Sequence, residues 1–276
     1  MNHERSPGPS EPAIVVEHLV THYGDRKILD DVSLTVAPGE IMVVMGGSGS
    51  GKSTLLRYVL GLHRPTSGVV RVLGHDINRA DAATMQMLRR HMGVAFQSGA
   101  LLSSMTVGEN VKLPLREHTK LDETTMGIMA RMKLEVVDLG GFEDLKPSEL
   151  SGGMVKRAAL ARAIVMDPKL LFFDEPSAGL DPVVAAELDE LILRLRDVLG
   201  ITIVVVTHEL ESAFKIADRI TVLDRGKILI SADVETVRRS DNQRVQDLLH
   251  RRVSRQELDA DSYIRRLTGA GRTEGT

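Results

Sequence analysis

The chain has 276 residues, enough to bury a substantial core as one α/β domain with an inserted lobe. Its 42% apolar and 26% charged residues are ordinary globular usage, and a net charge of −3 gives no electrostatic basis for a nucleic-acid partner. Cysteine is absent, which excludes disulfide bonds and thiolate metal sites.

The N-terminal segment 1–12 contains three prolines and lacks the apolar stretch of a signal peptide, so we expect a disordered leader. The longest apolar runs, such as 41–45 and 201–206, have the length of strands. None approaches the ~20 apolar residues that a spanning helix requires. If this protein serves a membrane, we expect another chain to cross it.

The first predicted elements are strands. The β-branched runs 14–20 and 32–36, with a turn at Pro38, predict a small antiparallel sheet. The run 41–45 predicts a buried strand of a parallel sheet, followed by a glycine-rich turn and a helix that ends near Gly61.

The middle of the chain predicts a change of structure. Residues 98–150 are helical in pattern and poor in strand signals, which indicates a helical lobe inserted into the sheet domain. The runs 170–173 and 201–206 predict two more buried strands, and a helix between them is expected to begin after Asp181 and end at Gly200.

Two other regions have less definite patterns. Met126, Met129 and Met132 are spaced along one face of a helix, which favours core filling over an apolar groove for a partner helix. The tail 241–276 predicts one or two short helices as a C-terminal extension.

A phosphate-binding loop is the strongest local motif. Residues 46–53 match the pattern GxxxxGK[ST] and lie between a predicted strand and a predicted helix, which disfavours a mere glycine-rich linker. Lys52 is expected to reach the β- and γ-phosphates, and Ser53 to hold Mg²⁺. The residues predicted to bind nucleotide here are Gly46, Gly47, Ser48, Gly49, Ser50, Gly51, Lys52, Ser53 and Thr54.

Two carboxylates end the apolar run 170–173. Ligands of open α/β sheets bind at the carboxyl ends of strands, so Asp174 and Glu175 are expected beside the phosphate-binding loop. Asp174 would hold Mg²⁺, and Glu175 would act as general base toward the attacking water. The alternative is a solvated strand end with a helix-capping role.

His208 follows the apolar run 201–207 and is expected at the same sheet edge, where it could touch the γ-phosphate. The alternative is a structural histidine.

The remaining motifs make the chain similar to the ABC ATPase family. Leu150–Met154 (LSGGM) resembles the LSGGQ signature, Ser177–Asp181 the D-loop, and Gln97 the Q-loop glutamine. Together with Tyr23, these motifs follow the family's order along most of the chain. The resemblance implies a P-loop NTPase (RecA-like) parallel-sheet core, a small antiparallel β subdomain and an inserted α-helical subdomain at about 98–158, within an ATPase domain of residues 13–240.

The family resemblance also implies how ATP is held. Two copies would form a head-to-tail dimer, with each ATP between the phosphate-binding loop of one copy and the signature of the other. Gln97 would contact the nucleotide and Mg²⁺, and Tyr23 would stack on adenine unless it is ordinary surface. The contacts that the resemblance assigns across the dimer come from Ser151, Gly152, Gly153 and Asp181, and the catalytic residues would be Lys52, Glu175 and His208.

Met154 stands where the common signature has glutamine. With Lys156–Arg157, the segments 44–48 and 96–102 and the tail around 240–249, it makes the chain similar to ATPases of MCE-type lipid transporters such as the bacterial Mla system. That subfamily implies an integral-membrane permease dimer, a periplasmic MCE-domain protein and a STAS-domain regulator, with no nucleic-acid partner. The ATPase would lie at the cytoplasmic side of the bacterial inner membrane as a peripheral subunit.

We therefore expect an ATPase that powers phospholipid transport. The alternatives are the ATPase of an importer for amino acids or other small solutes, a soluble ABC protein acting on DNA or ribosomes, and a nucleotide sensor without turnover. The intact set of Asp174, Glu175 and His208 counts against the last alternative.

Overall fold

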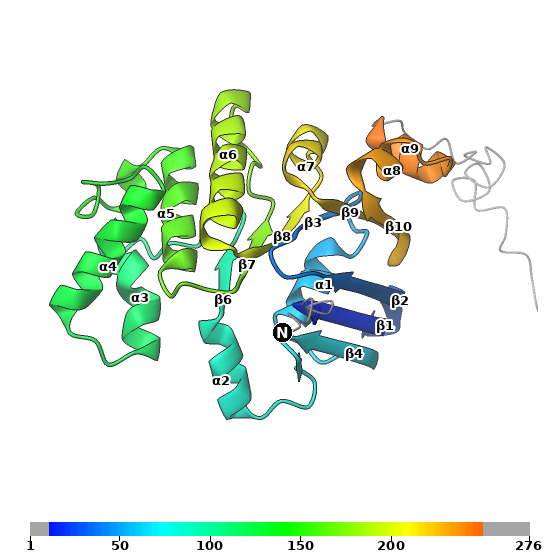
Figure 1. Ribbon diagram of the computed structural model, residues 1–276, viewed down its shortest axis with the longest axis horizontal. Helices are drawn as coiled ribbons and strands as arrows, with labels where there is room; N and C mark the ends of the chain where they lie inside the picture. The colour runs from blue at the N-terminus through cyan, green and yellow to red at the C-terminus, as the bar shows by residue number, and fades with distance from the viewer. Residues whose placement is uncertain (1–10, 251–276) are drawn as a thin grey trace, which may run out of the picture.

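The computed structural model describes residues 11–250, which form two β-sheets surrounded by helices (Figure 1). Most of the predicted leader (1–12) and of the predicted C-terminal extension (241–276) lies outside these residues.

The larger sheet has the order β10-β9-β3-β8-β7-β6. All neighbouring strands in it run parallel except the β9–β10 pair, which is antiparallel. The predicted buried strands are present, and three strands that were not predicted complete the sheet. The bounds are β3 (Ile41–Met45), β6 (Met92–Ala95), β7 (Leu170–Asp174), β8 (Thr202–Thr207), β9 (Arg219–Asp224) and β10 (Lys227–Asp233).

Both faces of this sheet are buried, which explains why its central strands are apolar throughout. Ile41, Val43 and Met45 of β3 face a core shared with the helical lobe, whereas Met42 and Val44 face a second core. Successive side chains of a strand point to opposite faces, so one short run serves both cores.

The smaller sheet packs on that second core. Its antiparallel order is β2-β1-β4-β5, so the predicted pair of strands gains two more. The elements on this side are β1 (Ile14–Tyr23), β2 (Arg26–Val36), α1 (Lys52–Val59), β4 (Ser67–Val72), β5 (His75–Asp76) and α2 (Ala82–Arg90).

Three helices form the lobe at one end of the molecule (Figure 1). They are α3 (Val107–His118), α4 (Glu123–Val136) and α5 (Gly152–Ile164), with the 3-10 helix η1 (Pro147–Glu149) before α5. Thr106 and Glu109 make a capping box at the start of α3, which satisfies backbone donors that the helix itself cannot pair. Ser151 caps α5 in a similar way by accepting from the backbone N–H of Met154.

The remaining helices pack on the same core of the larger sheet as the helical lobe. Asp181 caps the N-terminus of α6 (Pro182–Leu199), and Gly200 ends it in the left-handed conformation, as the sequence predicts. The others are α7 (Leu210–Ile216), α8 (Val234–Arg238) and α9 (Gln243–Leu249).

The methionine prediction is right in part. Met126 is buried and Met129 packs on the core, but Met132 is 61% exposed because the face of α4 that carries it has no neighbour within the described residues. Among residues 11–250, the helices all lack the combination of length and apolarity needed to cross a bilayer.

Candidate nucleotide-binding site

The strand register brings the predicted site residues to one edge of the larger sheet. Met45 pairs with Thr207 across β3 and β8, and Asp174 pairs with Val206 across β7 and β8. The phosphate-binding loop, the two carboxylates and His208 therefore all leave the sheet at neighbouring carboxyl ends. Ala95, two residues before Gln97, pairs with Phe173, which brings Gln97 to the same edge.

The phosphate-binding loop needs glycine at two positions for different reasons. Gly46 has φ 156°, and a Cβ there would lie 2.1 Å from the carbonyl oxygen of Leu223. Gly51 caps α1 with φ 110°, a conformation that other residues rarely adopt. These glycines let the chain turn tightly into the N-terminus of α1, whose free N–H groups favour phosphate.

The Lys52 ammonium lies against its own loop, where it donates to the carbonyls of Gly46 (2.8 Å) and Gly47 (3.1 Å). Burial lowers the pKa of Lys52, and the negative charges of Glu175 and Asp174 partly offset that effect. The ammonium is thus held beside the carboxylates, where an anionic phosphate would relieve its desolvation.

Asp174 ends β7 next to the hydroxyl of Ser53, with 3.5 Å between Asp174 Oδ1 and Ser53 Oγ. Burial raises the pKa of Asp174, and the charge of Glu175 raises it further. A carboxylate and a hydroxyl oxygen that lie close together are the kind of ligands that Mg²⁺ takes from a protein in a nucleotide site.

Glu175 and His208 contact each other directly. Glu175 Oε2 lies 2.9 Å from His208 Nδ1 and also accepts from the His208 backbone N–H at 3.3 Å. The Glu175 backbone has φ 52°, a conformation uncommon for a residue with a side chain. This turn directs the carboxylate away from the sheet and toward the cleft.

A cleft of about 650 Å³ joins these groups. That volume is within the usual range of small-molecule sites. Its lining includes Gly46, Gly47, Ser48, Gly49, Lys52, Ser53, Gln97, Asp174, Glu175 and His208.

The end of α9 also lines this cleft, which the sequence did not reveal. Asp247, Leu248 and Leu249 contribute to the lining, and two bonds from Arg244 to Asp224 at the end of β9 hold the helix there. No local motif marks these residues, because their place depends on where the chain returns after β10.

The other predicted contacts lie elsewhere. Ser50, Gly51 and Thr54 belong to the loop and α1 without lining the cleft, and Tyr23 is 67% exposed at the end of β1.

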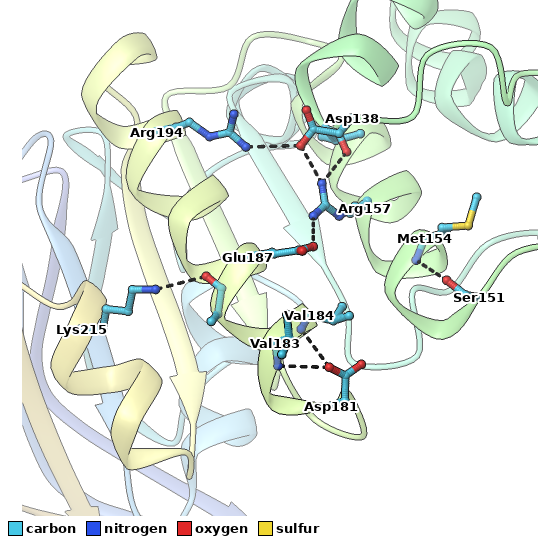
Figure 2. A network of polar contacts seen from close by, with 12 residues as sticks. Asp138, Ser151, Met154, Arg157, Asp181, Val183, Val184, Glu187, Arg194 and Lys215 are labelled. Atoms are coloured by element: carbon cyan, nitrogen blue, oxygen red, sulfur yellow. Dashed lines mark hydrogen bonds and ion pairs between the residues drawn. The ribbon is translucent and has the colours of Figure 1, made fainter.

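The signature residues lie on a separate depression. Ser151 and Gly153 line it together with Met154 and Arg157, and Gly152 begins α5 beside them. Asp181 accepts from the N–H groups of Val183 and Val184 at the adjoining start of α6 (Figure 2). The structure thus gathers one set of the predicted phosphate-binding residues in the cleft and leaves the other set on a different surface.

The parallel sheet and the loop–helix junction at its edge define a P-loop nucleotide hydrolase. The family model described as ABC transporter matches residues 29–178. The chain belongs to the ABC transporter family, as one of its ATP-hydrolysing subunits.

Two curated relatives and a solved structure support this assignment. The intermembrane phospholipid transport system ATP-binding protein MlaF of Haemophilus influenzae is 42% identical, over 86% of this chain and 89% of that protein. The "Probable ribonucleotide transport ATP-binding protein mkl" of Mycobacterium leprae is 40% identical, over 88% of this chain and 70% of that protein. A dimeric structure of the ATP-binding cassette MJ0796 in a post-hydrolysis state, bound to ADP and Pi, aligns with TM-score 0.74 and 30% identity, covering 80% of this chain and 98% of that one.

Proposed function

We propose that two copies of this chain hold two ATP molecules between them, each bound by the cleft of one copy and the signature depression of the other. The observation that carries the proposal is the separation of Lys52 and Ser151 into two depressions of one chain. The structure of the ATP-binding cassette MJ0796 bound to ADP and Pi is dimeric, which supports the pairing of two copies. In this proposal residues 13–240 are the ATPase domain, and residues 98–158 are its helical subdomain.

The predicted residues each have a task in this proposal. The loop amides and Lys52 bind the phosphates, Glu175 takes a proton from the attacking water, and His208 holds Glu175 and faces the γ-phosphate. Ser53, Asp174 and Gln97 would hold Mg²⁺, which when bound neutralises charge on the phosphates. Tyr23, exposed at the end of its strand, would stack on the adenine.

We further propose that ATP turnover by this chain powers phospholipid transport, because relatives named for that activity align along most of its length. The partners would be a permease dimer, a periplasmic MCE-domain protein and a STAS-domain regulator, with this chain on the cytoplasmic face of the inner membrane. Two exposed apolar surfaces suit protein partners. Phe96 and Leu102 lie on the segment that carries Gln97, and Ile128, Met132 and Val136 form a stripe along α4.

The test of cargo is reconstitution. The complex should be purified from detergent-solubilised membranes and its bound lipid identified by mass spectrometry. It should then be placed in donor liposomes that carry labelled phospholipid. ATP-dependent loss of label to acceptor liposomes, absent with E175Q, is the expected result. Turnover of ATP without lipid movement would contradict the proposed cargo.

A nucleotide cargo is the second candidate, since one relative is named for ribonucleotide transport. The same liposomes loaded with labelled ribonucleotide test it. ATP-dependent movement of ribonucleotide and not of phospholipid would replace the first candidate with the second.

A further inference from the structure

The helix that begins at the signature has a cationic side chain directed toward the turn after β7. Lys156 lies on α5, one turn beyond the Ser151 cap. Its Nζ donates to the backbone carbonyls of Pro176 (2.5 Å) and Ala178 (2.8 Å), and lies 3.4 Å from that of Glu175. A lysine ammonium has three protons to donate, so one side chain can serve all three acceptors.

The turn that receives these bonds needs support from outside. It begins with the left-handed conformation of Glu175 and has no regular ladder of its own. Within it, Ala178 N–H donates weakly to the Glu175 carbonyl at 3.3 Å, and Leu180 N–H donates to Ser177 at 3.1 Å. The carbonyls of an irregular turn have few other hydrogen-bond donors, and the Lys156 ammonium is one donor group that these carbonyls share.

Lys156 is also well placed electrostatically. Burial lowers the pKa of its ammonium, and the negative charge of Glu175 acts in the opposite direction. The ammonium of Lys156 therefore lies close enough to the predicted base for the two charges to attract each other.

We infer that Lys156 is a positioning residue for ATP hydrolysis: its bonds fix the backbone of Glu175–Ala178, and so link the signature helix to the base of the same subunit. This inference rests on the proposed role of Glu175 as general base. A phosphate that the other copy docks at Ser151 would shift the N-terminal end of α5. Lys156, through its bonds to the turn after β7, would transmit that shift to Glu175. In each copy, Lys156 thus supplies a side-chain connection between the two ATP sites of the dimer.

Other cations of α5 hold different neighbours, which separates their roles from that of Lys156. Arg157 binds the Val137 carbonyl and the carboxylates of Asp138 and Glu187. Arg162, near the far end of the helix, donates to the carbonyls of Gly99 and Ala100, just after Gln97. The helix is thereby anchored to the helical lobe, to α6 and to the Gln97 loop, while Lys156 reaches the turn that carries the base.

The test compares K156M and K156R with K133M. Lys133 is the matched control, because its side chain is only 14% exposed and it links α4 to Asp167, away from Glu175. Steady-state ATPase, affinity for a fluorescent ATP analogue and melting temperature are measured for each. K156M should lose at least about tenfold in kcat with KM and analogue affinity changed less than about twofold, as expected when an interaction acts only in the transition state.

The conservative variant separates positioning from mere folding. K156R should recover most of kcat, because a guanidinium still donates several bonds to carbonyls. K133M should keep the kcat of the original protein. If K156M does not fold, K156Q, which keeps two amide donors, is measured in the same way.

The outcomes distinguish this inference from the proposed function. A kcat of K156M equal to that of the original protein, or a loss that K133M shares, would overturn the role of Lys156 while E175Q remains inactive. If E175Q itself retains full turnover, the proposed base is wrong, and the inference falls with it.

Discussion

Glu175 combines an uncommon backbone conformation with an unusually complete set of neighbours. Its carboxylate accepts from His208, its backbone N–H donates to Val206 of β8, and its carbonyl faces Lys156. In the proposed role of general base, a carboxylate held on several sides is aimed at a water with little conformational entropy left to lose.

Replacing Glu175 by glutamine should preserve ATP binding and remove turnover. Glutamine keeps the size and an acceptor for His208 but cannot take a proton, so we expect kcat to fall by about 10²- to 10⁴-fold. Phosphate release measures kcat, and titration with a fluorescent ATP analogue measures affinity. E211Q is the control, since Glu211 is exposed in the first turn of α7 and lies outside the cleft lining. Steady-state activity of E175Q within tenfold of the original protein would contradict the base assignment.

Residues of the cleft were predictable where their chemistry is local in sequence. The phosphate-binding loop, the acids that end β7 and the histidine that ends β8 each follow a strand whose apolar pattern is visible. Lys156 and Leu248 carry no such signal, because their contacts join segments far apart along the chain. Spacing alone does not show which carbonyl a lysine reaches.

At the scale of elements, a cluster of charges ties the helical lobe to the core. Arg157 of α5 bridges Asp138, beyond the end of α4, and Glu187 of α6 (Figure 2). Arg194 of α6 approaches the same oxygen of Asp138 at 3.3 Å. The two arginines share a partner but differ in burial, since their side chains are 14% and 56% exposed.

That difference gives a matched pair of variants. R157M should lower the free energy of unfolding by about 1–3 kcal/mol, the range for charge-assisted hydrogen bonds that are partly shielded from water. R194M should change it by about 0–1 kcal/mol, as for an exposed ion pair. Urea denaturation followed by circular dichroism measures both. Equal losses in the two variants would show that burial does not set the strength of this cluster.

A second contact between elements should respond to pH. Asp189 of α6 is buried and accepts from the hydroxyl of Ser212 on α7, and burial raises the pKa of its carboxyl group. Because the folded-state pKa lies above the ordinary one, the ionised form costs stability near neutral pH, and protonation in acid removes that cost. D189N keeps an acceptor for Ser212 without the charge.

We therefore expect D189N to melt higher than the original protein near pH 7, by roughly 2–4 °C for a gain of about 1 kcal/mol. The gain should shrink as pH falls toward the acid range. E190Q is the control, because the neighbouring Glu190 side chain is 61% exposed. Differential scanning fluorimetry across pH measures the effect, and a gain that is constant with pH would contradict the desolvation argument.

The sequence predicts the buried strands β3, β7 and β8 and the capped helix α6, but it misses β9, which is also buried, and the short or exposed strands β6 and β10. β6 has only four residues, with a glycine inside, and β10 is mostly half-buried or exposed, so neither shows a clean apolar run. Both owe their place to pairing with β7 and β9. Tertiary context supplies the stabilisation that local propensity lacks.

For the whole molecule, the separation of the cleft from the signature depression is the decisive feature. A complementation experiment tests whether two copies complete each other. E175Q lacks the proposed base, and S151E places a negative charge where phosphate would dock. In a mixed dimer, one site pairs the E175Q cleft with the S151E signature and so contains both defects. The other site pairs the unchanged cleft with the unchanged signature and so is intact.

Each variant alone should be inactive, and an equal mixture should recover about a quarter of the original activity, since half of randomly formed dimers are mixed and each has one intact site. Phosphate release after mixing and re-equilibration measures this. The control is a mixture of E175Q with K52A. Both variants carry their defect in the cleft, so each site of a mixed dimer has one defective cleft and the mixture should stay inactive. Recovery in the control, or none in the test mixture, would contradict a shared site.

The caps at the starts of α5 and α6 have a consequence for how two such surfaces would meet. Ser151 and Asp181 already accept from backbone N–H groups of their own helices. Their rotamers are therefore fixed before any encounter, and little side-chain freedom remains to be lost on contact. Two such preordered surfaces would associate without rearranging their side chains. More of the free energy of ATP binding would then be available to move a partner bound to the dimer.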